Sequence, residues 1–202
     1  TTTLITGANK GIGYETARQL VLASHTVWIG SRDLARGRAA AEKLGARAVQ
    51  LDITDDASVA AAAATIEALD VLVNNAAVEE RGDGNAVIGP VDVTADLVRT
   101  TFDTNVFGTV RVLHAFLPLL QRSAAPVVVN VSSGLGSLTV VSSIPADVYP
   151  GVAYPASKAA VNMITVQYAK AFPAMRINAA DPGFTKTDLN GSTGTQTVEE
   201  GV

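Results

Sequence analysis

Short apolar runs alternate with longer amphipathic segments along most of the chain. Short runs rich in β-branched residues are typical of buried strands, and apolar residues recurring every three or four positions are typical of helices. This pattern predicts strands at residues 2–6, 26–30, 46–51, 71–74, 126–132 and 176–180. It predicts helices at residues 12–22, 34–44, 57–69, 97–120 and 152–171. Asp33 is placed to cap the second helix.

Strict alternation of strands and helices indicates an α/β fold with a doubly wound parallel sheet of the Rossmann type. No Pro-, Gly- and Ser-rich linker divides the chain, so we expect a single domain over residues 1–202. Ligands of such sheets bind at the carboxyl ends of the strands. Two long loops, residues 78–90 and 134–151, are expected to overhang that edge.

Composition excludes several classes of chemistry. The 202 residues include no Cys and only two His, so we expect no disulfide, no thiol nucleophile and no metal site. A net charge of -4 without basic clusters argues against nucleic acid as a partner. No apolar run is long enough to span a bilayer, and no leader is apparent, which predicts a cytoplasmic protein without a membrane partner.

The string TGANKGIG, residues 6–13, places Gly7, Gly11 and Gly13 where the first strand turns into the first helix. Free N–H groups at a helix start suit a pyrophosphate. The spacing differs from both G-x-G-x-x-G and the P-loop, which disfavours a nucleotide triphosphatase. Taken alone, the motif is also compatible with a tight turn that binds nothing.

Four further motifs follow this turn: NNA at residues 74–76, Asn105, VNVSS at 129–133 and YPASK at 154–158. Together with the turn, in this order and spacing, they resemble the short-chain dehydrogenase/reductase family. The resemblance covers nearly the whole chain and implies a Rossmann fold that binds a nicotinamide dinucleotide. The wide separation of Ser133 from Tyr154, together with ANKGIG, is similar to the carbonyl reductase branch.

Tyr154 and Lys158 lie four residues apart and share one face of a helix. A nearby ammonium favours phenolate and is expected to bring the pKa of the tyrosine toward neutral pH. Such pairs also occur on solvated faces of helices, so the catalytic assignment depends on the other residues that are expected beside the pair. The resemblance implies that Ser133 positions a substrate carbonyl and that Asn105 helps to hold the lysine through a water. Ser132 is the alternative serine.

Charge at the end of the second strand favours NADP(H). An acidic residue there would bind the ribose hydroxyls of NAD, whereas this chain has Ser31 followed by Arg32. Arg32 and Lys10 can grip a 2'-phosphate. The alternatives are that both are ordinary surface charges, or that Asp33 faces the ribose.

Further cofactor contacts are implied by the resemblance. Asp52 would hold the adenine amino group, although a turn or capping aspartate is the plain alternative. Thr185 and Thr187 would bind the nicotinamide carboxamide. The implied cofactor-binding residues are Gly7, Asn9, Lys10, Gly11, Ile12, Gly13, Arg32, Asp52, Ile53, Asn75, Ala76, Pro182, Gly183, Thr185 and Thr187.

Some features depart from the family pattern. Ala77 and Asp181 replace a usual glycine and asparagine, and the resemblance leads us to expect a further strand and helix beyond residue 202. Residues 184–202 are expected to form a mobile tail that covers the substrate.

The sequence therefore predicts an NADPH-dependent carbonyl reductase with Asn105, Ser133, Tyr154 and Lys158 as catalytic residues. Apolar residues in 134–151 suggest a hydrophobic ketone, aldehyde or quinone as substrate. The alternatives are a non-catalytic NADP(H)-binding regulatory protein, and an epimerase or dehydratase of the extended relatives. Monomer and homo-oligomer both stay open.

Overall fold

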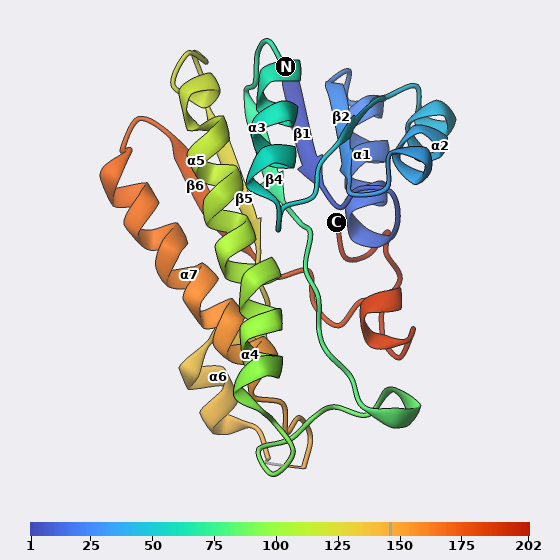
Figure 1. Ribbon diagram of the computed structural model, residues 1–202, viewed down its shortest axis with the longest axis vertical. Coiled ribbons are helices and arrows are strands. Elements are labelled where there is room, and N and C mark those ends of the chain that lie inside the picture. Colours follow the sequence, from blue (N-terminus) through green and yellow to red (C-terminus); the bar gives the residue numbers. More distant parts are fainter. Residues whose placement is uncertain (146) are drawn as a thin grey trace.

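A parallel sheet forms the centre of the structure, a computed structural model that describes residues 1–145 and 147–202 (Figure 1). Within those residues the sheet has six strands in the order β3-β2-β1-β4-β5-β6. The strands are β1 (Thr2–Thr6), β2 (Thr26–Ser31), β3 (Arg47–Gln50), β4 (Val71–Asn74), β5 (Val127–Val131) and β6 (Arg176–Ala180). This order is that of the Rossmann fold, so the predicted fold class is confirmed.

Helices cover both faces of the sheet (Figure 1). Helices α1 (Gly11–Leu22) and α2 (Leu34–Leu44) pack on one face. Helices α3 (Asp56–Thr65), α5 (Thr109–Leu120) and α7 (Ala153–Ala171) pack on the other. Helix α4 (Ala95–Phe102) leads into α5, and the short α6 (Leu138–Ser143) precedes α7. No helix in the described ranges is both long and apolar enough to cross a bilayer.

Neighbouring residues of β1 point into the two different cores. Leu4 packs in the cluster that contains Leu113 and Phe116 of α5, and Ile5 packs in the cluster that contains Ala17 of α1. Both strand side chains are fully buried. A strand covered by helices on both faces has no solvent side, which explains why the two neighbouring positions Leu4 and Ile5 are both apolar.

The structure differs from the predicted elements at three places. Helix α3 ends at Thr65 because Ile66 adopts an extended backbone, and the buried Ile66 and Leu69 join the core from a non-helical segment. A π turn at Asp103–Gly108 separates α4 from α5 in the predicted helix 97–120. The predicted loop 134–151, of which residue 146 lies outside the described part, contains α6.

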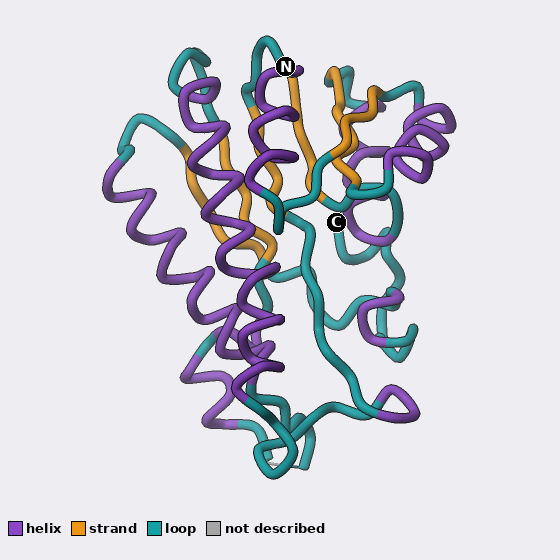
Figure 2. The backbone as a smooth tube through the Cα atoms, viewed as in Figure 1, coloured by secondary structure: helices purple, strands orange, loops and turns teal. Residues whose placement is uncertain are grey.

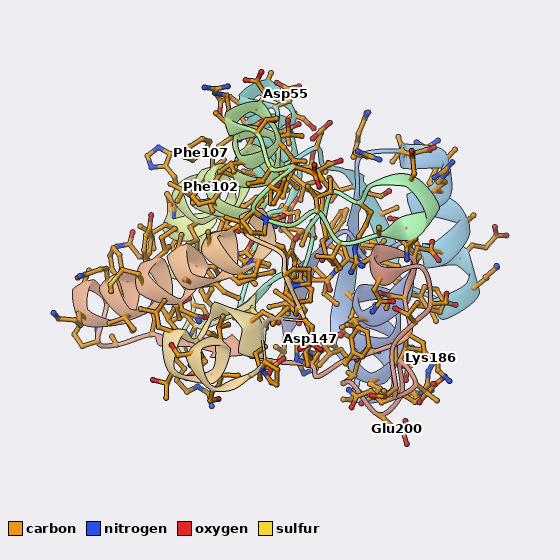
Figure 3. All side chains as sticks on the ribbon, turned by 90° about the horizontal axis from the view of Figure 1, so that it is seen from below. Asp55, Phe102, Phe107, Asp147, Lys186 and Glu200 are labelled. Carbon is orange, nitrogen blue, oxygen red and sulfur yellow. The ribbon has the colours of Figure 1, made fainter. Side chains whose placement is uncertain are left out.

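The longest loops follow β4, β5 and β6 and extend from the edge where the strands end (Figure 2). Figure 3 views the molecule from this side, with Asp147 from the loop after β5 and Lys186 and Glu200 from the segment after β6 labelled. Side chains from distant parts of the sequence therefore meet where a Rossmann sheet binds ligands.

Candidate active site

A cleft of about 1170 Å³ lies at the carboxyl edge of the sheet. The glycine turn and the loops after β4, β5 and β6 line it. The volume lies above the usual range for pockets that bind one drug-sized ligand, which leaves room for a larger ligand.

The glycine turn forms the floor of one half of this cleft. Gly7 and Gly11 both have positive φ, +64° and +58°, a conformation that favours glycine. A Cβ at Gly13 would come 2.5 Å from Nδ2 of Asn75, so a side chain would clash there. Helix α1 starts directly after Lys10 without a side-chain cap, and its first N–H groups stay available for an anion.

Asn75 and Ala76 hold the turn in place. Both backbone N–H groups donate to Oγ1 of Thr6 at 3.0 Å. The Asn75 amide donates to the carbonyl oxygens of Thr6 and Gly7 at 2.9 and 3.3 Å. The motif NNA therefore ties the end of β4 to the glycine turn, and both residues also line the cleft.

At the end of β2, Asp33 is turned toward its own helix. Its carboxylate accepts from the N–H of Arg36 at 3.1 Å and pairs with the Arg36 guanidinium at 3.3 Å. Ser31 donates to the Asp33 carbonyl oxygen at 2.8 Å. Asp33 thus caps α2 as predicted, and the exposed Arg32 lines the cleft.

Lys10 and Asp52 are engaged with neighbours. Nζ of Lys10 lies 2.7 Å from Asp188 in the segment after β6, and both side chains are exposed. The Asp52 carboxylate accepts from the N–H and the hydroxyl of Thr54, and these bonds lower its pKa. Asp52 is therefore a turn residue that also lines the cleft beside Ile53.

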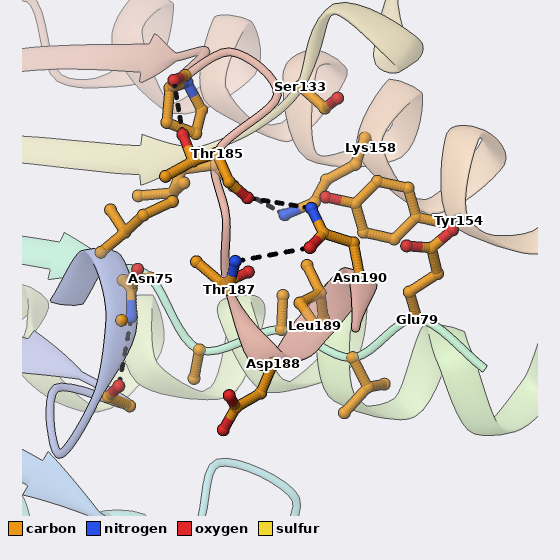
Figure 4. A pocket seen from close by; sticks show the side chains of 18 of the residues that line it. Asn75, Glu79, Ser133, Tyr154, Lys158, Thr185, Thr187, Asp188, Leu189 and Asn190 are labelled. Carbon is orange, nitrogen blue, oxygen red and sulfur yellow. Dashed lines mark hydrogen bonds between the residues drawn. The ribbon is translucent and has the colours of Figure 1, made fainter. Parts of the chain in front are cut away.

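Tyr154 and Lys158 project from one face of α7 into the other half of the cleft (Figure 4). Nζ of Lys158 lies 5.5 Å from the centre of the Tyr154 ring and donates to the Val131 carbonyl oxygen at 2.7 Å. Lys158 is only 3% exposed, and this burial lowers its pKa to about 8. A solvated helix face, the alternative interpretation of this pair, is thus ruled out for Lys158.

The pKa of Tyr154 is raised, opposite to the direction expected from the lysine pair. Burial contributes most, followed by the negative charges of Glu79 and Asp181. Arg81 and a hydrogen bond with Ser133 act in the lowering direction without compensating. Spacing identified the ammonium but could not reveal two carboxylates from other loops.

The two serines after β5 have different surroundings. Ser132 is buried, and its hydroxyl donates to Oδ1 of Asn162 at 2.6 Å. Ser133 accepts from the N–H of Leu135 at 3.2 Å and interacts with the Tyr154 phenol. These contacts favour Ser133 over Ser132 as the serine beside the tyrosine.

Asn105 lies in the π turn, a feature that often marks functional sites. Its amide oxygen accepts from the Val78 N–H at 2.8 Å. Its Nδ2 donates to the Val78 carbonyl at 2.9 Å and to the Ser157 hydroxyl at 3.0 Å. Asn105 therefore fastens the loop after β4 to α7, one residue from Lys158.

The segment after β6 crosses the cleft above the glycine turn. A Cβ on Gly11 would lie 3.5 Å from Cγ2 of Thr187, which places Thr187 over the turn. Thr185 is buried, and its hydroxyl donates to the Pro182 carbonyl at 3.0 Å. Asn190 donates to the Thr185 carbonyl at 2.9 Å (Figure 4). The remaining predicted cofactor residues Asn9, Ile12 and Gly183 also line the cleft.

Sequence reasoning missed the polar residues of two loops. Glu79 and Arg81 follow the NNA motif, and Tyr149 lies in the loop before α7. All three line the cleft near Tyr154. The one signal in the sequence for these residues was the run of two acids and an arginine, residues 79–81, in a loop expected at the ligand-binding edge.

Comparisons with known proteins agree with this arrangement. The sequence profile described as short chain dehydrogenase matches residues 1–197. A (+)-neomenthol dehydrogenase from Arabidopsis thaliana is 33% identical, over 98% of this chain and 88% of the relative. Salutaridine reductase from Papaver somniferum superposes with a TM-score of 0.86 at 28% identity, covering 99% of this chain and 92% of that one. NADPH-bound carbonyl reductase from chicken fatty liver gives a TM-score of 0.87 at 27% identity, covering 99% and 87%.

Proposed function

Because the chain belongs to the short-chain dehydrogenase/reductase family, an oxidoreductase family that uses a nicotinamide cofactor, we propose that it reduces a carbonyl compound to an alcohol with NADPH. The observation that carries the proposal is that Tyr154, Lys158 and Ser133 share one cleft with an anion-binding glycine turn. This combination supports an enzyme over a non-catalytic binding protein, because binding alone needs no buried lysine beside a tyrosine.

The glycine turn fits the pyrophosphate of such a cofactor, since Gly13 has no room for a side chain and the start of α1 is uncapped. Reduced nicotinamide supplies a hydride to the carbonyl carbon when it is bound. Tyr154 would donate a proton to the carbonyl oxygen, and Ser133 would hold that oxygen by a hydrogen bond. The raised pKa of Tyr154 keeps its proton in place at neutral pH, as a donor requires.

Lys158 would orient and assist Tyr154 from one helical turn away. Its bond to the Val131 carbonyl fixes the ammonium at the end of β5, and a pKa of about 8 lets it lose or gain a proton near working pH. Asn105 would keep the loop after β4 in register with α7 through Val78 and Ser157.

The preference for NADPH over NADH is supported by the end of β2. Asp33 is occupied by Arg36 and the start of α2, so it does not compete for the ribose. Arg32 forms no ion pair among the described residues and lines the cleft, where it can grip a 2'-phosphate.

The substrate half of the cleft supports a hydrophobic ketone, aldehyde or quinone. Its wall includes Leu135, Val140, Ile144 and Val148 from the loop after β5. Two similar proteins are named neomenthol dehydrogenase and salutaridine reductase, which is consistent with a small organic carbonyl compound or alcohol as substrate. Loop residues of this sort set specificity on a shared fold.

The test is consumption of NADPH, with NADH in parallel, across a panel of aldehydes, ketones and quinones. Tyr154→Phe should lose turnover by at least about 100-fold, because general acid catalysis contributes about that much or more. Tyr168→Phe, on the same helix but packed against Phe172, is the matched control and should keep turnover. Equal turnover by both variants would refute the proposal.

A further inference from the structure

A buried acid lies beside Tyr154 on the substrate side of the cleft. Glu79, in the loop after β4, has a side chain that is only 7% exposed. Its carboxylate accepts a hydrogen bond from the Tyr149 phenol and lies 2.7 Å from Nη2 of Arg81. Figure 4 shows this carboxylate next to the Tyr154 ring.

The cluster of Glu79, Arg81 and Tyr149 is costly to build. Desolvation of a buried ion pair commonly offsets its attraction, so an apolar cluster of the same size would hold the loop equally well. Nε of Arg81 is buried and has no hydrogen-bond partner among the described residues. A buried polar cluster with an unsatisfied member calls for a role beyond packing.

The cluster belongs to the wall of the site. Glu79, Tyr149 and Tyr154 all line the large cleft, and they also line a second, much smaller cavity beside it. Glu79 comes from the loop after β4 and Tyr149 from the loop before α7. Their hydrogen bond therefore closes two loops against each other next to the tyrosine.

Charged and titratable groups face Tyr154 from every element packed around it. Glu79 and Arg81 come from the loop after β4, Tyr149 from the loop before α7, Asp181 from the end of β6, and Lys158 from α7 itself. Glu79 is the largest charge effect on the pKa of Tyr154 and raises it, while Arg81 acts in the opposite direction and less strongly. The pKa of Tyr149 is raised by burial and by Glu79, so its phenol stays a donor.

We propose that Glu79, held between Tyr149 and Arg81, is a positioning residue that joins the two substrate-side loops and keeps the phenol of Tyr154 in its proton-donating form. The proposal rests on the reductase function above. Reduction requires the proton on Tyr154, whereas the reverse oxidation of an alcohol requires a proton acceptor there. Glu79 therefore adds to the effect of burial and raises the pH at which the site changes from one state to the other.

Opposite charge changes distinguish this role from a structural one. In plots of rate against pH, carbonyl reduction should decline at high pH and alcohol oxidation should rise. In Glu79→Gln both of these limbs should move to lower pH by about one unit, because the pKa of Tyr154 falls. In Arg81→Gln both limbs should move up. A merely structural cluster would lower activity in both variants without moving the limbs in opposite directions.

Two variants control for charge and for contact. Glu80→Gln removes the same charge from the exposed neighbouring residue and should move the limbs much less, because water screens it. Tyr149→Phe keeps both charges but removes the bond between the loops, so it should raise KM several-fold while leaving the limbs nearly in place.

Glu79→Gln leaves Arg81 buried and unpaired, which can prevent folding. The double variant Glu79→Gln/Arg81→Gln leaves no unpaired charge there. Its limbs should still move down, by less than in Glu79→Gln, because Glu79 has the larger effect on Tyr154. Limbs of the double variant that stay in place or move up would overturn the proposal.

Phenolate absorbance tests the same inference without turnover. The absorbance due to Tyr154 phenolate is obtained at about pH 11 by subtracting the absorbance of the matching Tyr154→Phe variant from that of each protein. The ionised fraction should increase in Glu79→Gln and in the double variant relative to the otherwise unchanged protein. Unchanged ionisation would overturn the role of Glu79 even if the enzyme reduces carbonyls, whereas loss of the reductase function alone would leave this ionisation difference intact.

Discussion

At the scale of single residues, the site depends on which side chains already form hydrogen bonds within the protein. Asp33 accepts a hydrogen bond from the first turn of α2, and Ser132 donates one to Asn162. Their neighbours in sequence, Arg32 and Ser133, line the cleft, Arg32 without an ion pair among the described residues and Ser133 beside the Tyr154 phenol. Adjacent residues after β2 and after β5 thus have different surroundings.

Replacing Arg32 by alanine should reduce the preference for NADPH over NADH by about tenfold or more, because a charge-assisted bond to phosphate contributes roughly 1.5–3 kcal/mol. The measurement is the ratio of kcat/KM for the two cofactors. Arg38→Ala, which removes an exposed arginine of α2, should leave the ratio unchanged. An equal ratio in both variants would remove Arg32 from cofactor selection.

The buried Lys158 should make stability depend on pH. Its pKa falls from 10.5 to about 8 on folding, so the unfolded chain binds more protons between these values. The free energy of unfolding should therefore rise as the pH increases through this window, a gain of up to roughly 3 kcal/mol that is absent below about pH 8.

Lys158→Met should lack this rise and lose turnover, whereas Lys170→Met, at an exposed position of α7, should keep both. Urea unfolding at about pH 7 and about pH 10 measures the difference. If the urea midpoints of the wild type and of Lys158→Met changed equally between the two pH values, burial of Lys158 would not destabilise the fold.

At the scale of elements, the sequence predicted the order of strands and helices because apolar periodicity and turn residues are local signals. The end of α3 could not be predicted, since Ile66 and Leu69 satisfy the core equally well from a helix or from the extended segment that the structure has. Motif spacing located Tyr154 and Lys158. The charges of Glu79 and Asp181 that act on Tyr154 come from other loops and required the tertiary structure.

The π turn gives a prediction at this scale. Asn105→Ala would leave the buried amide pairing with Val78 and Ser157 unmade, which should lower the free energy of unfolding by about 2–3 kcal/mol. Urea denaturation measures it, with Asn178→Ala at an exposed position of β6 as control. A loss no greater than that of the control would mean that the loop holds its place without Asn105.

At the scale of the whole molecule, the glycine turn and three longer loops from the same edge of the sheet line one cleft. The glycine turn and the segment after β6 border the proposed cofactor half, and the loops after β4 and β5 border the proposed substrate half. The ion pair of Lys10 with Asp188 joins the glycine turn to the segment after β6 across the cleft. Entry of a dinucleotide is therefore expected to involve movement of residues 184–202.

Asp188→Asn should tighten NADPH binding by about twofold to threefold, because it frees Lys10 and removes a carboxylate near the phosphates, while exposure to solvent keeps the effect small. Fluorescence titration at low and high salt measures the Kd, and the gain should shrink at high salt. Weaker binding by Asp188→Asn would instead show that the closed segment helps to retain the cofactor.

The central claim is hydride transfer to a carbonyl carbon with Tyr154 as proton donor. It is tested most directly by supplying NADPH deuterated at the transferable position and analysing the product of the best substrate by mass spectrometry. The account predicts one deuterium on the new carbinol carbon with the wild-type enzyme, and none above background with Tyr154→Phe although that variant still binds NADPH. Deuterium transfer at an unchanged rate in Tyr154→Phe, or NADPH bound without any transfer in the wild type, would contradict it.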